Sequence, residues 1–156
     1  MKTHHAASLL TPEIRQRVED LLSRMTLEEK IGQLNQLGTS IYSEDERLLE
    51  DARDLIRSGR VGSFLSIHGA ARINAAQRVA VEESRLGIPL LFATDVIHGF
   101  RTISPIPLGE AASWFPEAVD AAAACAARAA SAGGIAWTFA PMVDIARDPR
   151  WGRMAE

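Results

Sequence analysis

Charged and imidazole side chains follow the apolar segments in the second half of the chain. Asp95 stands near the end of the apolar run 90–96, where a carboxylate meets either a polar ligand or a structural partner. Because the carboxyl ends of barrel strands carry the groups that bind substrate, we expect Asp95 to bind a ligand rather than to cap the loop 97–100. His98 is a second candidate, although a loop histidine bonded to backbone fits its position equally well.

The segment 147–153 concentrates three guanidinium groups, a carboxylate and an indole within the run Arg-Asp-Pro-Arg-Trp-Gly-Arg. Guanidinium groups suit bidentate contacts with carboxylates or hydroxyls, and an indole face suits the apolar face of a sugar ring. Arg147 and Arg153 are therefore candidate ligand-binding residues. A surface loop held together by Arg–Asp pairs explains the same residues equally well.

A second carboxylate, Asp144, follows the last apolar segment of the chain. Together with Asp95 it invites a glycosidase hypothesis, in which one carboxylate is the nucleophile and the other the acid, about 5 Å away. Ser66 and His68 follow an earlier apolar segment and are expected at the same edge. A module that binds a polyol without cleaving it fits these residues too, and the residue pattern alone leaves both hypotheses open.

The elements that position these residues alternate between strands and helices. Apolar strands are predicted at 61–67, 90–96 and 135–143, with helices at 70–85 and 116–131 between them. Such a pattern predicts an α/β fold with a parallel sheet covered by helices. The glycines of the run 59–62 precede a strand instead of following one, so they do not form a phosphate-binding loop. We therefore expect part of a (β/α)8 barrel, with about three parallel strands, rather than a nucleotide-binding sheet.

Amphipathic helices are predicted before the first strand. Thr11 and Pro12 form a helix start, and Thr26 with Glu29 forms a capping box that opens a second helix, expected to end at Gly38. A third amphipathic stretch, at about 48–59, completes this part. We thus expect a helical segment over residues 1–58 and the βαβαβ portion of a barrel domain over residues 59–156.

Composition excludes several classes of function. The chain of 156 residues has a formal net charge of -3, so it lacks the positive field that binds nucleic acid. Cys125 is the single cysteine, which excludes an internal disulfide, and no metal site or cofactor is predicted. Neither a signal peptide nor a membrane-spanning segment is found, so we expect a cytoplasmic protein as the sequence is written, and a periplasmic one if its true N-terminus is missing.

Four segments in collinear order resemble glycoside hydrolase family 3, and most closely its bacterial β-glucosidases. They are 24–34 (RMTLEEKIGQL), 93–99 (ATDVIHG), 107–111 (PLGEA) and 137–153 (WTFAPMVDIARDPRWGR). The resemblance implies a (β/α)8-type barrel followed by an α/β sandwich domain, and retaining hydrolysis of terminal β-D-glycosides without a metal. It also implies that Asp95 binds hydroxyls of the sugar in the cleaved subsite and that Arg153 contacts that sugar.

The resemblance places the catalytic groups elsewhere. The family nucleophile is an Asp on a later barrel strand, and the acid/base is a Glu of the following domain, so both are expected beyond Glu156, and Asp144 does not carry over as a catalytic carboxylate. We therefore expect a portion of the enzyme that contributes the sugar-subsite residues Asp95 and Arg153, with His98 and Arg147 as further candidates. The alternative is a non-catalytic carbohydrate-binding or scaffold fragment.

An unclosed parallel sheet has consequences for partners. A complete barrel has eight strands, and the open edge after the segment 135–143 would pair with the remaining C-terminal part or with a second copy. The other expected partner is a β-glucoside or another β-glycoside. One local departure from the family is Phe115, which stands where a capping residue such as Asn commonly precedes the matching proline.

Overall fold

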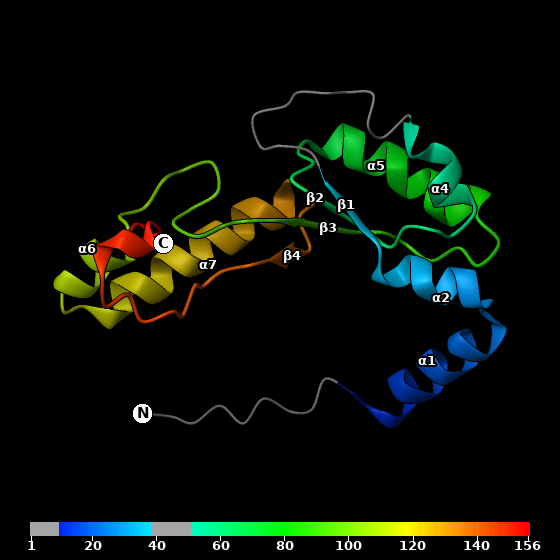
Figure 1. The fold of residues 1–156 in the computed structure, drawn as a ribbon, viewed down its shortest axis with the longest axis horizontal. Helices are drawn as coiled ribbons and strands as arrows, with labels where there is room; N and C mark the ends of the chain where they lie inside the picture. Colours follow the sequence, from blue (N-terminus) through cyan, green and yellow to red (C-terminus); the bar gives the residue numbers. More distant parts are fainter. Residues whose placement is uncertain (1–9, 39–50) are drawn as a thin grey trace.

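The computed structural model describes residues 10–38 and 51–156. The elements in chain order are α1 (Pro12–Arg24), α2 (Leu27–Leu34), β1 (Gln36–Gly38), α4 (Arg53–Arg57), β2 (Ser63–Leu65), α5 (Ala70–Arg78), the π-helical turn η1 (Val79–Glu83), β3 (Leu91–Thr94), α6 (Pro107–Ala112), α7 (Pro116–Ala132), β4 (Trp137–Thr138) and the short 3-10 helix η2 (Pro149–Trp151). Strands and helices alternate from β1 onward (Figure 1).

The four strands form one parallel sheet in the order β1-β2-β3-β4. Phe64 of β2 lies between Leu37 of β1 and Phe92 of β3, and Thr94 pairs with Thr138 of β4. All carboxyl ends therefore meet at one edge of the sheet. The predicted α/β class with parallel strands is confirmed, and the arrangement agrees with part of a (β/α)8-type barrel.

The strand β1 corrects the prediction that the second helix continues to Gly38. The helix ends at Leu34, and the carbonyl of Asn35 accepts hydrogen bonds from the N–H groups of Gly62 (3.1 Å) and Ser63 (3.3 Å). Pairing with β2 over three residues thus decides the conformation of a segment whose apolar pattern also fits a helix. β1 lies within the predicted helical segment 1–58, and the division of the chain at residue 58 stays a prediction.

Other element boundaries differ from the sequence prediction in similar ways. The strand expected at 135–143 pairs only over Trp137–Thr138, and Pro141 further along has no N–H to donate. α6 begins at Pro107, within the segment expected as a loop up to Gly109, and the predicted helix 70–85 changes to π-helical geometry at Val79. The predicted amphipathic stretch 48–59 is represented by α4, and its first residues lie outside the described ranges.

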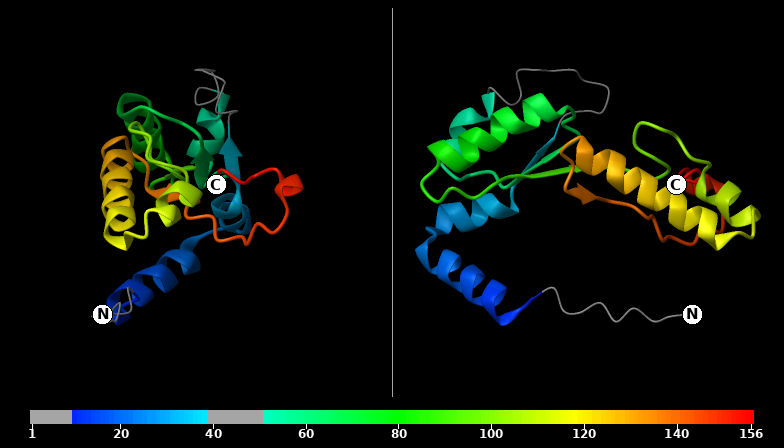
Figure 2. Two further views of the ribbon diagram at one scale, coloured as in Figure 1. Left: turned by 90° about the vertical axis from the view of Figure 1, so that its left-hand side faces the viewer. Right: turned by 180° about the vertical axis from the view of Figure 1, so that it is seen from behind.

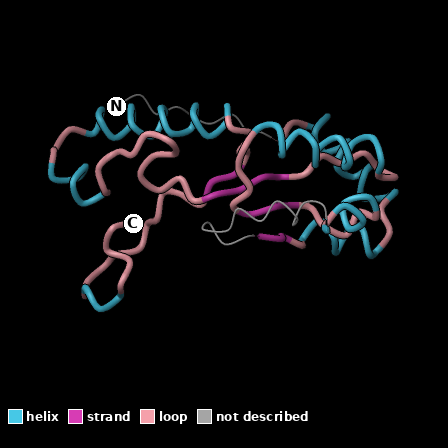
Figure 3. Tube along the Cα trace, turned by 90° about the horizontal axis from the view of Figure 1, so that it is seen from above, coloured by secondary structure: helices cyan, strands magenta, loops and turns pink. Residues whose placement is uncertain are grey.

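The core lies between the sheet and the helices α4 and α5 with η1, which Figure 2 shows on one side of the strands. Phe64 and Phe92 stack with their ring centroids 5.7 Å apart, and both are almost fully buried. Ala130 and Ile135 bring the C-terminal end of α7 and the start of the β4 segment into the same core. Figure 3 shows the C-terminal segment extending away from the sheet.

The helix starts follow the sequence rules. Thr11 accepts a hydrogen bond from the N–H of Ile14, and the capping box of Thr26 and Glu29 is complete, so both predicted starts are confirmed. α7 begins at Phe115 without a side-chain cap. The described residues contain no helix long and apolar enough to cross a bilayer.

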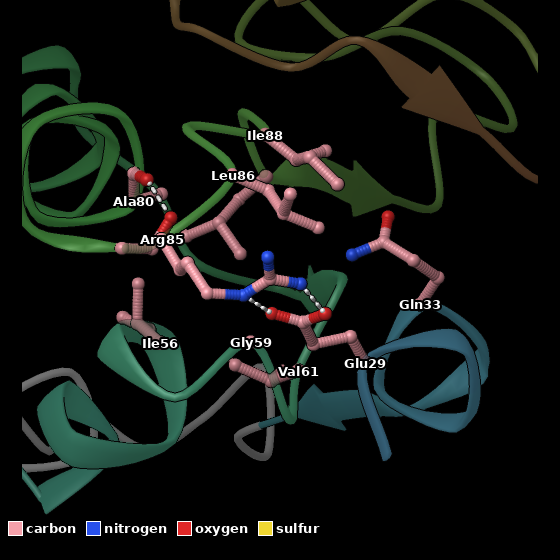
Figure 4. A pocket seen from close by; sticks show the side chains of 11 residues that line it. Glu29, Gln33, Ile56, Gly59, Val61, Ala80, Arg85, Leu86 and Ile88 are labelled. Atoms are coloured by element: carbon pink, nitrogen blue, oxygen red, sulfur yellow. Dashed lines mark hydrogen bonds and ion pairs between the residues drawn. The ribbon is translucent and has the colours of Figure 1, made fainter. Parts of the chain in front are cut away.

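An ion pair between Glu29 and Arg85 joins the N-terminal helices to the rest of the molecule (Figure 4). The carboxylate of Glu29 accepts from Arg85 Nε at 3.0 Å and Nη2 at 2.5 Å, while Arg85 Nη2 also donates to the carbonyl of Arg24 at 2.8 Å. Arg85 thus holds the end of α1 and the start of α2 together. Hydrogen bonds from Arg85, and then from the N–H of Thr26, lower the pKa of Glu29.

The lowered pKa of Glu29 predicts a loss of stability in acid. The stability that the charged Glu29 side chain contributes is present above the ordinary glutamate pKa of 4.5. It is lost as the pH falls through the lower pKa of Glu29 in the folded state. We expect Glu29→Gln to lower the melting temperature at pH 7 and to shrink the drop in melting temperature between pH 6 and pH 3. Glu28→Gln, at an exposed residue of the same helical turn, is the control and should behave like the wild type. Equal acid sensitivity of the wild type and Glu29→Gln would contradict the assignment.

Close packing of α2 on the turn before β2 predicts that Gly32 tolerates no side chain. A Cβ at Gly32 would lie 2.0 Å from the carbonyl oxygen of Gly59, whereas one at Gly109 of α6 would meet nothing closer than 3.5 Å. We expect Gly32→Ala to lower the free energy of unfolding by about 1–3 kcal/mol through overpacking. The matched change Gly109→Ala should be neutral or raise it by up to about 1 kcal/mol. Denaturant unfolding measures both, and a Gly32→Ala protein as stable as the wild type would contradict this packing.

Candidate functional site

The candidate site lies at the carboxyl edge of the sheet, where β2, β3 and β4 end. The parallel order places the residues after β2 beside those after β3, and the latter beside the segment that follows β4. Thr94 is buried as the last residue of β3, and Asp95 directly after it is exposed. The last three residues of β3 are buried, and the strand then presents one carboxylate to solvent.

Arg153, which follows β4, interacts electrostatically with this carboxylate. The hydrogen bond to Glu156 is the main reason that the pKa of Arg153 is raised, and the charges of Glu156, Asp95 and Asp144 raise it further. Arg153 Nε donates to Glu156 Oε1 at 2.6 Å, and Nη2 donates to Oε2. One guanidinium thus lies within the electrostatic reach of carboxylates from two strand ends.

His98 belongs to the same group of charges. The hydrogen bond from Arg153 is the largest cause of the lowered pKa of Glu156, and the charge of His98 contributes as well. Arg147, by contrast, is exposed and makes no hydrogen bond or ion pair within the ranges 10–38 and 51–156. The structure therefore brings three of the four predicted residues, namely Asp95, His98 and Arg153, into one region, whereas in the described part of the chain Arg147 has no hydrogen bond or ion pair that ties it to them.

Part of the segment 147–153 is internally paired. Asp148 caps η2 by accepting from the N–H of Arg150 at 2.9 Å, and its carboxylate accepts from Arg150 Nε at 2.9 and 3.0 Å and also pairs with Nη2. The side chain of Arg150 lowers the pKa of Asp148, and its N–H lowers it further. The surface-loop interpretation thus accounts for Asp148 and Arg150. Trp151 keeps an indole that is 39% exposed beside them.

Asp95 and Asp144 do not have the environment of an acid–nucleophile pair. Both are exposed, whereas a general acid needs an apolar surrounding that keeps its proton on at neutral pH. Both also act on the same guanidinium, that of Arg153. The arrangement suits hydrogen bonding to a polar ligand, because carboxylates accept from hydroxyls and a guanidinium donates to them.

Two residues at this edge, Thr94 and Glu156, are not predicted as site residues from the sequence. Thr94 Oγ1 lies 3.2 Å from His68 Nε2, and Glu156 accepts a hydrogen bond from Arg153. The spacing of three residues between Arg153 and Glu156 could have indicated that pair, but no sequence signal joins His68 to Thr94 across 26 positions. The described residues contain no group of three or more His, Cys, Asp or Glu side chains that could hold a metal ion.

An apolar pocket of about 550 Å³ borders the same edge, because Val96 and Ile97 after β3 and Thr138 at the end of β4 contribute to its wall. Residues of the loop 96–107, of α6 and α7, and of the segment 138–142 line it, and alanines of α7 form much of its wall. Its polar lining is sparse, so it does not suit a sugar. Around the Glu29–Arg85 pair the cavity is only about 20 Å³, room for a single water molecule.

Comparison with known proteins identifies the family. Residues 26–156 match the family described as Glycosyl hydrolase family 3 N terminal domain. The chain belongs to glycoside hydrolase family 3. The resemblance seen in the four sequence segments is thereby confirmed, and the charged edge is the carboxyl edge of a glycoside hydrolase family 3 sheet.

Individual relatives are long proteins. The chain is 43% identical to a "Periplasmic beta-glucosidase" of Salmonella typhimurium, over 94% of this chain and 19% of that protein. It is 32% identical to a "Putative beta-xylosidase" of Formosa agariphila, over 92% of this chain and 21% of that protein. The solved structure of a β-glucosidase from Listeria innocua in complex with glucose superposes with a TM-score of 0.78 at 37% identity, over 91% of this chain and 21% of that chain. The chain thus spans about a fifth of the length of these relatives.

Proposed function

We propose that this chain supplies the glycone-binding part of a retaining β-glucosidase-like hydrolase, which acts on terminal β-D-glycosides. Asp95 and Arg153 are the residues that bind the sugar hydroxyls. The observation that carries the proposal is the parallel pairing of β3 with β4, which brings Asp95, directly after β3, beside the segment that leads to Arg153, 58 positions further along the chain. The charge of Asp95 also raises the pKa of Arg153. Membership of the family and the names of the relatives support the substrate class.

The chemistry of the two groups fits a sugar ring. The Asp95 carboxylate offers acceptors for two neighbouring hydroxyls, and the Arg153 guanidinium donates to a hydroxyl oxygen on the same ring. Charge-assisted hydrogen bonds of this kind are stronger than neutral ones and fix the orientation of the ligand. His98 and Arg147 remain further candidates for contacts with the sugar, and the exposed face of Trp151 suits the apolar face of a ring.

The bond-breaking groups are expected outside this chain. The resemblance assigns the nucleophile to a later barrel strand and the acid/base to a following domain, and the described residues contribute four parallel strands whereas a closed (β/α)8 barrel has eight. β4 pairs on one side only within the described part of the chain, and Val143 and Ile145 beyond it are 83% and 79% exposed. We infer that further strands, or a second copy, cover this edge.

Sugar binding is expected to depend on the charge of Asp95. We expect Asp95→Asn to weaken glucose binding by about tenfold to a hundredfold, because hydrogen bonds to a charged group contribute more than those to a neutral amide. Asp54→Asn on α4, which removes another exposed carboxylate, should leave the affinity unchanged. Titration calorimetry or ligand-observed NMR measures the dissociation constants. An unchanged affinity in Asp95→Asn would overturn the assignment of Asp95.

Hydrolysis by this chain alone is expected to be negligible. With neither nucleophile nor acid/base present, an aryl β-glucoside should be cleaved no faster by the purified chain than by buffer. Release of the coloured aglycone measures the rate. Robust turnover that Asp95→Ala abolishes would contradict the placement of the catalytic groups.

The alternative function is a non-catalytic carbohydrate-binding or scaffold fragment, favoured by the exposure of Asp95 and Trp151. Both functions predict binding that depends on Asp95, so binding alone does not separate them. Co-expression separates the two functions. The partner in this experiment is the part of the Salmonella typhimurium relative that follows the matched segment. Restored hydrolysis supports the hydrolase, whereas sugar binding without turnover supports the fragment.

The cellular location is part of the same proposal. Two relatives, from Salmonella typhimurium and Dickeya chrysanthemi, carry "Periplasmic" in their names. We propose the periplasm for the enzyme to which this segment corresponds, which agrees with the second of the two sequence expectations.

A further inference from the structure

The turn after β2 has an unusual backbone. Ser66 adopts the left-handed conformation with φ 61°, and Gly69 has φ 99°. A Cβ at Gly69 would meet no atom within 4 Å. The positive φ of this residue, and not a lack of space, is therefore the reason that glycine is favoured there. A serine in the left-handed region costs energy, and such conformations gather at functional sites. Between these two residues the turn places His68 at the carboxyl edge of the sheet.

His68 reaches across from β2 to the end of β3. Its Nε2 lies 3.2 Å from Oγ1 of Thr94, a residue that is only 3% exposed. The imidazole also contacts the ring of Phe100, with the centroids 5.8 Å apart. Thr94 and Phe100 lie directly before and directly after the segment 95–99, which carries Asp95. His68 therefore contacts the residues at both ends of that segment.

The surroundings of His68 favour the neutral imidazole. The residue is exposed at the surface, yet partial burial of its ring lowers the pKa of His68, and the charges of Arg72 and Arg101 lower it further. A neutral ring leaves one nitrogen to donate and the other to accept, so it can bond the Thr94 hydroxyl in either direction. It also adds no positive charge beside the Asp95–Arg153 pair.

We propose that His68 is a positioning residue of the sugar site, because its hydrogen bond to Thr94 holds the end of β3 and so fixes the direction of Asp95. The proposal rests on the function proposed above for Asp95. A ligand-binding carboxylate must be held within about 0.5 Å of its working geometry, and Asp95 itself is exposed to solvent. The bond from His68 therefore acts on Asp95 through the neighbouring backbone.

Three single variants of the full chain and one double variant test this role. His68→Leu and Thr94→Val each remove the hydrogen bond, whereas His68→Gln keeps a polar nitrogen near the position of Nε2. We expect faster amide hydrogen exchange at residues 94–96 and about threefold to tenfold weaker glucose binding in His68→Leu and Thr94→Val. His68→Gln should restore most of both properties. The double variant of His68→Leu and Thr94→Val should be no worse than either single change, because both remove one interaction.

Several outcomes would overturn the proposal. They are unchanged exchange at residues 94–96 in His68→Leu, additive effects in the double variant, and a His68→Gln protein as impaired as His68→Leu. Thermal unfolding followed by circular dichroism controls for a general loss of structure. The exchange measurement needs no sugar, so it decides the role of His68 even if Asp95→Asn shows that Asp95 does not bind glucose. Failure of the proposed function and failure of this inference are thereby distinguished.

Discussion

Parallel pairing of the four strands is the constraint on which the rest of the structure depends. In a parallel sheet the carboxyl ends of all strands lie at the same edge. Residues that are distant in the chain therefore become neighbours there. The pairing of Thr94 with Thr138 brings the end of β3 beside the segment that leads to Arg153. The charge of Asp95 acts on Arg153 because of that geometry.

Polar interactions hold the helices around this sheet. Arg85 ties α1 and α2 to the turn after η1, and Glu83 of η1 pairs with Arg53 and Arg57 of α4. The Glu29 side chain is only 11% exposed, so its charge needs the guanidinium partner. The pairs of α4 are more exposed and are worth less, because water and salt screen them.

At the carboxyl edge, the same residue types take two different roles. Asp148 and Arg150 satisfy each other within one turn and shape η2, so they are structural. Asp95 makes no comparable local pair within the described residues, and its charge acts on the guanidinium of Arg153, which leaves its oxygens available to a ligand. His68 and Thr94 lie at the same edge, and the hydrogen bond between them crosses from β2 to β3. The proposed sugar-binding residues and the residues that position them thus lie at or after the ends of three successive strands.

The amino-acid sequence by itself determined the local features. Capping by Thr11 and Thr26 depends on residues within one helical turn, and the apolar segments around β2 and β3 identify strands by their own composition. Asp95 and Arg153 were found as candidates in the same way, from their positions after apolar strands and from the family resemblance. Only the tertiary structure decided that residues 36–38 form a strand, because pairing with β2 outweighs a local pattern that also fits a helix. It also decided that His68 meets Thr94, since this contact depends on strand register and turn geometry, which no local spacing encodes.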